Sequence, residues 1–201
     1  HGGRIGDVVP VCGALGGRAA FESLSATARS HGLGVVVDIV PNHLGVATAR
    51  ENPSWWDVLR HGRASAHAHV FDIDWTAGRI ALPVLVDDAD VAELTVDRTG
   101  DETTLAYYEH RFPVDPSTDD GSDDARVVHD RQAYELVGWR SGRIGYRRFF
   151  SVSDLAGIRQ EDPAVFDWSH EQVRSWFTDG LVDGVRVDHP DGLTDPADYL
   201  R

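Results

Sequence analysis

The chain has 201 residues, with 33 acidic against 19 basic residues and a formal net charge of −14. This balance argues against nucleic acid as a partner, because binding a phosphate backbone requires basic surface. A hydrophobic content of 41% is enough for a domain-sized core, and neither an apolar run long enough to cross a membrane nor a signal-peptide pattern occurs.

The chain ends and the cysteine content bear on the completeness of the chain and on its cellular compartment. The sequence begins at His1 and stops at Arg201, just after the start of a predicted helix, so we expect a segment of a longer chain. The single cysteine, Cys12, can form no internal disulfide, and nothing indicates an oxidising compartment. We therefore predict a cytoplasmic location. The sequence leaves the oligomeric state open.

The first predicted elements are a helix and a buried strand. Three apolar residues recur at helical spacing: Phe21, Leu24 and Ala28. His31 and Gly32 form a typical helix end. Residues 33–40 are a nearly continuous apolar run rich in β-branched residues, typical of a strand buried on both faces of a parallel sheet. Asp38 interrupts the run, and the sequence Pro41-Asn42-His43 ends it.

The pattern from residue 45 to about 140 is irregular. It predicts, in order, an aromatic turn at 53–56, short strands at 70–75 and 80–86, an exposed acidic loop at 115–124 and a helix at 124–139. We interpret this region as an insertion into a βα scaffold.

A second helix and strand follow the insertion. Asp162 suits a helix N-cap, Pro163 suits the first helical position, and Gly180 suits the helix end. The stripe between them is mostly apolar: Val165, Phe166, Ser169, Val173, Trp176 and Phe177. Residues 184–188 then alternate as a strand does, and a turn begins at His189. Two helix-to-strand steps imply a parallel sheet with right-handed crossovers.

Both predicted strand ends carry polar residues. Arg186 and Asp188 are two positions apart and share one face, and a nearby guanidinium favours the charged carboxylate that a nucleophile requires. A strand-end ion pair without chemistry would show the same pattern. Asp38, Asn42 and His43 stand at the other strand end, where a buried Asp satisfied by loop amides is the alternative. In a parallel barrel such residues converge on one face.

Other polar clusters indicate no metal site and no cofactor. His61, His67 and His69 lie in a predicted loop without a nearby cysteine, so we expect solvated histidines. The acidic loop lacks the ligand spacing of a calcium site. Trp55 and Trp56 either line a sugar site or pack the insertion, and both readings stay open.

Two short motifs and several longer segments carry a family resemblance. Residues 38–43 (DIVPNH) and 184–189 (GVRVDH) resemble two signatures of the α-amylase superfamily, glycoside hydrolase family 13. Five further segments resemble the maltooligosyltrehalose synthases: 51–59, 107–113, 146–150, 154–157 and 188–193. These matches are ordered and run through nearly the whole chain.

The resemblance implies a fold and a reaction. The fold is α/β, part of a (β/α)8 TIM barrel with a long insertion between two consecutive barrel strands. Residues 1–44 and 141–201 would be barrel segments, 45–140 an insertion subdomain, and the rest of the barrel would lie outside this chain. The reaction would be intramolecular transglycosylation. It would convert the reducing-end α-1,4 linkage of a maltooligosaccharide into an α,α-1,1 linkage, an isomerase step of trehalose biosynthesis.

The resemblance also implies residue roles. Asp188 would be the nucleophile and Arg186 would keep it ionised and oriented. His43 would donate a hydrogen bond to the sugar, braced by Asn42 and Asp38. The remaining substrate-binding residues in the matching segments would be the following: His189, Asp191 and Trp55.

The chain departs from the family pattern at several positions. His1, Gly2, Asp7 and the sequence Leu15-Gly16-Gly17 fit the family motif before the first helix. Three other positions differ from it: Gly3 and Arg4 replace a Tyr-Asp pair, and Val8 replaces a proline. The chain therefore lacks the tyrosine that the family pattern places against the sugar. The sequence Ser151-Val152-Ser153-Asp154 stands where the family has Asp-Val-Asn-Asp.

The acid/base Glu and a third Asp are expected on later strands, beyond Arg201, so we expect the 201-residue chain alone to be inert. Two alternatives stay open for the longer protein: a hydrolytic α-amylase-type enzyme, and a noncatalytic sugar-binding or structural relative.

Overall fold

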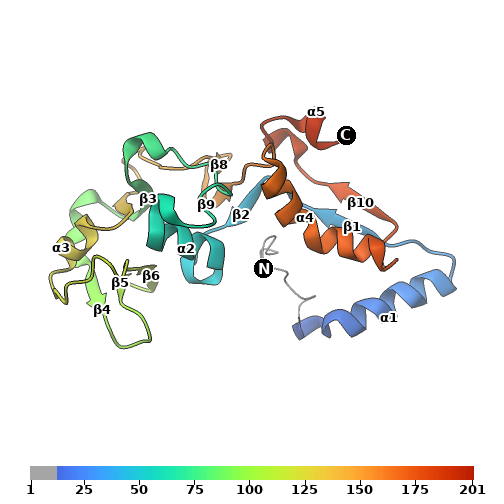
Figure 1. Ribbon diagram of the computed structural model, residues 1–201, viewed down its shortest axis with the longest axis horizontal. Coiled ribbons are helices and arrows are strands. Elements are labelled where there is room, and N and C mark those ends of the chain that lie inside the picture. Colours follow the sequence, from blue (N-terminus) through green and yellow to red (C-terminus); the bar gives the residue numbers. More distant parts are fainter. Residues whose placement is uncertain (1–12) are drawn as a thin grey trace. The chain divides into compact units, whose positions relative to one another are not determined.

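The computed structural model describes residues 13–201 and is mixed α/β (Figure 1). The predictions made for Gly3, Arg4, Asp7 and Val8 lie outside the described residues. The chain divides into two compact units. Unit 1 comprises the described residues up to Leu44 together with Ile158–Arg201, and unit 2 comprises Gly45–Gly157. No helix within residues 13–201 is long and apolar enough to cross a membrane.

Unit 1 contains the two helix-to-strand steps that the sequence predicts. Its elements are α1 (Gly17–Ser30), β1 (Val36–Ile39), α4 (Pro163–Thr178), β10 (Gly184–Val187) and the short α5 (Pro196–Tyr199). The predicted helix signals are confirmed: the Asp162 carboxylate accepts a hydrogen bond from the Ala164 amide at 2.9 Å, and Gly32 and Gly180 follow the helices with positive φ.

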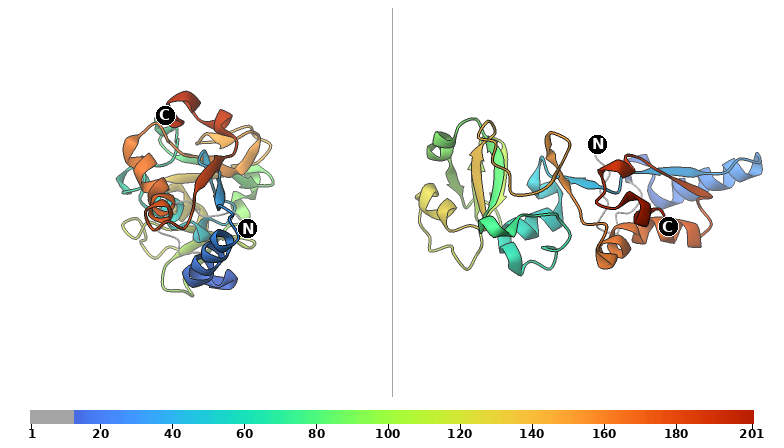
Figure 2. Two further views of the ribbon diagram at one scale, coloured as in Figure 1. Left: turned by 90° about the vertical axis from the view of Figure 1, so that its right-hand side faces the viewer. Right: turned by 90° about the horizontal axis from the view of Figure 1, so that it is seen from above.

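Strands β1 and β10 lie side by side and run parallel (Figures 1 and 2). The register pairs Val36 with Gly184 and Asp38 with Arg186. The prediction that β1 is buried on both faces is wrong for this structure, because Val36 is 66% exposed and the strand alternates between exposed and half-buried positions. The reason is that, among the described strands, β1 pairs only with β10 in a two-stranded sheet.

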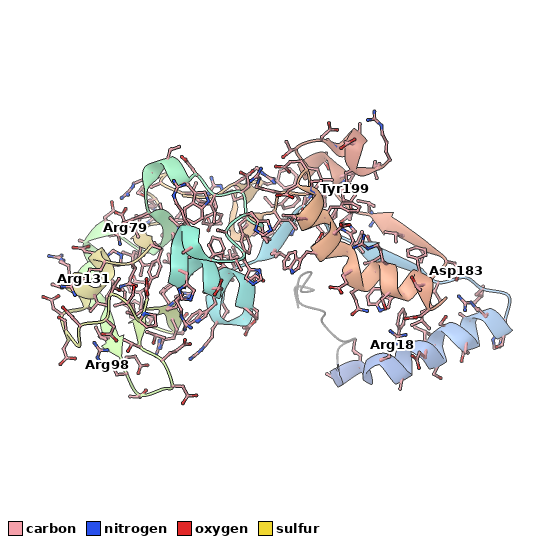
Figure 3. All side chains as sticks on the ribbon, in the orientation of Figure 1. Arg18, Arg79, Arg98, Arg131, Asp183 and Tyr199 are labelled. Atoms are coloured by element: carbon pink, nitrogen blue, oxygen red, sulfur yellow. The ribbon has the colours of Figure 1, made fainter. Side chains whose placement is uncertain are left out.

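The helices of unit 1 pack on each other through contacts between α1 and α4. The rings of Phe21 and Trp176 meet edge to face, with centroids 5.3 Å apart. Arg18, labelled in Figure 3, binds Asp179 beyond the end of α4 at 2.7 Å. The Ser25 hydroxyl donates to the Leu181 carbonyl at 2.9 Å. These contacts hold the segment that leads into β10.

Unit 2 includes a parallel strand pair, a three-stranded antiparallel sheet and two helices. The parallel pair is β3 (Ile80–Leu85) with β7 (Tyr134–Gly138), and the antiparallel sheet is β4 (Thr95–Asp97), β5 (Thr104–Tyr107) and β6 (His110–Pro113). The helices are α2 (Pro53–His61) and α3 (Ala125–Asp130), and β2 (His43–Gly45) leads into the unit along the chain. The largest fully buried side chains include Trp55, Tyr134 and Phe71.

Three sequence-based predictions in unit 2 are wrong. Residues 53–56 begin helix α2, with Asn52 capping the Trp55 amide at 3.0 Å, and do not form a turn. Residues 70–75 form no named strand; Ile73 makes an isolated bridge with Tyr146. The helix expected at 124–139 ends at Asp130, because residues 134–138 gain more from parallel pairing with β3 than from helical bonds.

The second boundary between the units lies later than the sequence suggests. The sequence pattern predicts an insertion that ends at residue 140, whereas unit 2 runs to Gly157. The added segment carries the antiparallel pair β8 (Arg148–Phe149) and β9 (Val152–Gly157). It is tied into unit 2 because Arg147 pairs with Asp72 at 2.7 Å and the Asp72 amide donates to the Gly157 carbonyl at 3.0 Å.

Candidate active site

The polar residues at the ends of β1 and β10 meet within unit 1. Because these strands are parallel neighbours in the register above, their carboxyl ends lie at the same edge. The Asp188 amide continues the pairing by donating to the Ile39 carbonyl at 2.8 Å. We call this group the strand-end cluster, and its members are Asp38, Asn42, His43, Arg186, Asp188 and His189.

Arg186 holds two carboxylates of the strand-end cluster. Its Nη1 donates to Asp38 Oδ2, and its Nη2 donates to Asp188 Oδ1 at 2.8 Å. These hydrogen bonds, first to Asp38 and then to Asp188, raise the pKa of the Arg186 guanidinium. The Asp188 side chain is 32% exposed, against 59% for Arg186, so the candidate nucleophile is the more sheltered of the two.

Asn42 joins the two strand ends. It is fully buried, and its side-chain amide donates to the His189 carbonyl at 2.6 Å. Its Oδ1 is bonded to His43 Nδ1. Since the amide group is committed to a carbonyl, Oδ1 is the acceptor and His43 Nδ1 carries the proton. One buried residue therefore sets the position of His189 and the orientation of the His43 ring.

His189 turns the chain sharply after the candidate nucleophile. Its backbone has φ 50° and ψ 51°, a left-handed conformation that costs roughly 1–3 kcal/mol for a residue other than glycine. The hydrogen bond from Asn42 to its carbonyl helps to hold this conformation. The ring lies between two carboxylates, with Nε2 3.7 Å from Asp188 Oδ2 and Nδ1 3.8 Å from Asp191 Oδ1.

Trp55 does not belong to this cluster. It lies on α2 in the core of unit 2, where it is 1% exposed. Its ring packs edge to face against Phe71 at 4.8 Å and Tyr146 at 5.2 Å. The reading of Trp55 as a sugar-stacking residue is therefore not supported, because its side chain is buried within its own unit.

A polar residue that has no distinguishing signal in the sequence also supports the segment after β1. Gln160 is 7% exposed and donates to the Pro41 carbonyl at 2.7 Å, directly before Asn42. The segment Arg159-Gln160-Glu161 is polar and precedes a helix, so its sequence looks like an ordinary surface loop. No local signal marks Gln160 as buried.

Comparison with known proteins gives a consistent result over the whole chain. A Mycobacterium tuberculosis (strain H37Rv) protein named as a maltooligosyl trehalose synthase is 56% identical over 202 residues, which is 100% of this chain and 26% of that protein. The structure of maltooligosyltrehalose synthase from Arthrobacter ramosus matches with 52% identity and a TM-score of 0.88, covering 97% of this chain and 26% of that one. No family model matches.

The chain is similar over its whole length to one quarter of a maltooligosyltrehalose synthase. A more distant structure agrees, from Sulfolobus tokodaii, described as a hypothetical maltooligosyl trehalose synthase. It has 37% identity and a TM-score of 0.85, and covers 97% of this chain and 26% of that one. A cyclomaltodextrinase at 16% identity and a TM-score of 0.56 shares the fold alone. The resemblance to maltooligosyltrehalose synthases stated from the sequence is thus confirmed.

Proposed function

We propose that this chain supplies the nucleophile-bearing part of a maltooligosyltrehalose synthase. The observation that carries the proposal is the identity of 52% to the Arthrobacter ramosus enzyme over 97% of this chain. The chain spans 26% of that enzyme, so the activity belongs to a longer protein. In that protein we place β1 and β10 as neighbouring strands of a (β/α)8 barrel and unit 2 as the insertion between them.

The cluster is suited to nucleophilic catalysis by Asp188. Arg186 holds Oδ1, so the carboxylate is fixed in one rotamer and Oδ2 would attack the anomeric carbon. Asp38 binds the second nitrogen of Arg186 and so keeps the guanidinium in place. His43, oriented by Asn42, would hydrogen-bond the sugar whose linkage is cleaved, and His189 and Asp191 would line the same position.

The reaction has two displacements at one carbon. Attack by Asp188 would break the terminal α-1,4 bond and form a glycosyl ester, while a second carboxylic acid protonates the departing glucose. The retained glucose would turn, and its anomeric hydroxyl would attack the anomeric carbon of the ester while the second carboxylate takes the hydroxyl proton. The bond to Asp188 would break, giving the α,α-1,1 linkage with overall retention. Retaining enzymes place these carboxyl groups about 5–5.5 Å apart. We place the acid and a third Asp on barrel strands outside this chain.

The reaction requires that water be excluded while the ester exists, because water would give hydrolysis instead. The product would be an isomer of the substrate, which makes the longer protein an isomerase acting on maltooligosaccharides. A cytoplasmic location rests on the single cysteine alone.

Product analysis of the full-length protein tests the proposal. We expect maltopentaose to lose its reducing end and to yield a trehalose-capped isomer of the same mass, with little free glucose. Glucose and maltose as the main products would instead indicate a hydrolase. The absence of any product, in a folded protein that binds the sugar, would indicate a noncatalytic relative.

A further inference from the structure

A buried chain of polar side chains lies behind the strand-end cluster. It runs from Tyr199 through His170 and Ser169 to Gln160, and ends at the Pro41 carbonyl. Gln160, Ser169 and His170 are 7%, 5% and 8% exposed. All of these residues belong to unit 1, and none is among the residues that face the proposed sugar position.

The hydrogen bonds at the Tyr199 end of this chain have an assigned direction. His170 Nδ1 lies 2.9 Å from the Phe166 carbonyl, which can only accept, so Nδ1 carries the proton. Nε2 of the neutral ring then accepts from the Tyr199 hydroxyl at 2.6 Å. Burial lowers the pKa of His170, which keeps the ring neutral. The Phe166 ring stacks on the imidazole with centroids 4.3 Å apart and fixes its plane.

The second half of the chain connects α4 to the segment after β1. The Ser169 hydroxyl lies 2.9 Å from His170 Nδ1 and donates to Gln160 Oε1 at 3.2 Å. Gln160 Nε2 donates to Ser169 Oγ at 3.0 Å and to the Pro41 carbonyl at 2.7 Å. Each N–H of the Gln160 amide is therefore used, and the side chain has a single orientation.

The two ends of this chain lie in the segments that carry the proposed catalytic groups. Tyr199, labelled in Figure 3, follows Asp188 and the turn at His189 in the sequence, and its ring lies 5.6 Å from that of Phe166 on α4. Pro41 directly precedes Asn42 and His43. The Ile158 amide donates to the Asn42 carbonyl at 3.1 Å, so two consecutive carbonyls before His43 are held by residues 158–160.

We propose that Gln160 is a positioning residue whose own orientation is fixed by Ser169, His170 and Tyr199. Its amide holds the backbone of residues 41–43 so that His43 lies within hydrogen-bond distance of the sugar. The inference rests on the proposed function. A binding group must be held within about 0.5 Å of its productive position by residues whose own rotamers are fixed. β1 ends at Ile39 and the next strand, β2, begins at His43, so the Gln160 amide holds the Pro41 carbonyl in the segment between the two strands.

The test uses the full-length protein with Gln160→Leu, which has a similar volume but no amide. The matched control is Gln132→Leu in unit 2, where a glutamine that is 3% exposed also bonds a carbonyl, that of Val128, at 2.7 Å. We expect Gln160→Leu to lower kcat about 10- to 100-fold, the cost of a displacement near 1 Å, and to raise the proportion of hydrolysed sugar. Gln132→Leu should leave both unchanged.

Hydrogen exchange on the same proteins separates this inference from the proposed function. We expect faster exchange over residues 38–46 in Gln160→Leu, with α4 still protected, and this readout requires no turnover. If the wild-type protein makes no trehalose-capped product, the proposed function fails while the exchange result still decides the positioning role. Ser169→Ala gives the same effects at smaller size if Gln160→Leu does not fold. The inference would be overturned if Gln160→Leu kept the wild-type kcat and product ratio, or if its hydrogen exchange over residues 38–46 were unchanged.

Discussion

The two carboxylate oxygens of Asp188 have different surroundings. Oδ1 accepts from Arg186 at 2.8 Å, and Oδ2 faces His189 Nε2 at 3.7 Å, beyond hydrogen-bond distance. This asymmetry suits a carboxylate that is held by one oxygen and reacts through the other. Asp188→Asn keeps the shape of the side chain but cannot form the glycosyl ester.

We predict that Asp188→Asn in the full-length protein loses nearly all transglycosylation while maltooligosaccharide binding persists. The measurements are product formation and a direct binding isotherm. Asp183→Asn is the control. Asp183 directly precedes β10 and accepts a hydrogen bond from the Val35 amide, at the opposite end of the strand pair from Asp188. Activity of Asp188→Asn within about tenfold of wild type, roughly 1.4 kcal/mol of barrier, would falsify the nucleophile assignment.

Helix α4 is the element that connects the site to the rest of unit 1. Its first turn is capped by the Asp162 carboxylate, and its middle carries Ser169 and His170. We predict that Asp162→Ala lowers the local stability of α4 by about 0.5–2 kcal/mol, because the Ala164 amide loses its acceptor. Amide hydrogen exchange over residues 163–178 measures this loss directly.

Asp167→Ala on the same helix is the matched control for Asp162→Ala. Its carboxylate is 65% exposed and pairs with Arg174, so the change in stability should stay within about 0.5 kcal/mol. Equal effects of the two substitutions would show that loss of negative charge, and not loss of the cap, weakens the helix.

At the scale of the whole molecule, each unit has a buried neutral histidine among its described residues. His129 in unit 2 is 2% exposed, and its ring accepts a hydrogen bond from the Leu136 amide at 3.0 Å. His170 in unit 1 is 8% exposed. Burial lowers the pKa of both from the ordinary value of 6.5. Below pH 6.5 the unfolded chain therefore binds protons that the folded chain does not.

We predict that both units are most stable above pH 6.5 and lose stability as the pH falls from 6.5 through the lowered pKa values. Hydrogen exchange at pH 7.5 and 5.5, corrected for intrinsic rates, measures the loss in each unit separately. His129→Gln should flatten the dependence in unit 2 and leave that of unit 1 unchanged. A stability that rises on acidification would contradict the buried neutral state.

The isolated 201-residue chain provides a further test at this scale. We predict that it does not turn over maltooligosaccharides, because a nucleophile alone cannot expel a sugar alkoxide efficiently without a proton donor. Unit 1 also exposes Leu15, Leu33 and Val36, at 78%, 63% and 66%, so we expect a tendency to aggregate. The measurement is loss of reducing ends, with Asp188→Ala in the same chain as the control. Turnover above that control would place the acid within these residues.

The sequence alone determined the features that depend on local pattern. Helices α1 and α4 have apolar residues at helical spacing and standard end signals, and both occur as predicted. The strand ends that carry Asp38 and Asp188 also meet as predicted, because parallel pairing brings the carboxyl ends of neighbouring strands to the same edge. The helices are decided by side-chain period within one segment, whereas the meeting of the strand ends follows from the inferred parallel pairing of two distant strands.

Only the tertiary structure decided the features that depend on distant partners. Residues 134–138 leave the predicted helix because β3 offers a parallel edge more than fifty residues earlier in the chain, from Ile80 paired with Tyr134. Trp55 is a core residue because Phe71 and Tyr146 cover it. Gln160 is buried because Pro41 and Ser169 satisfy its amide. Burial of a polar group depends on partners that fold against it, and no local pattern specifies them.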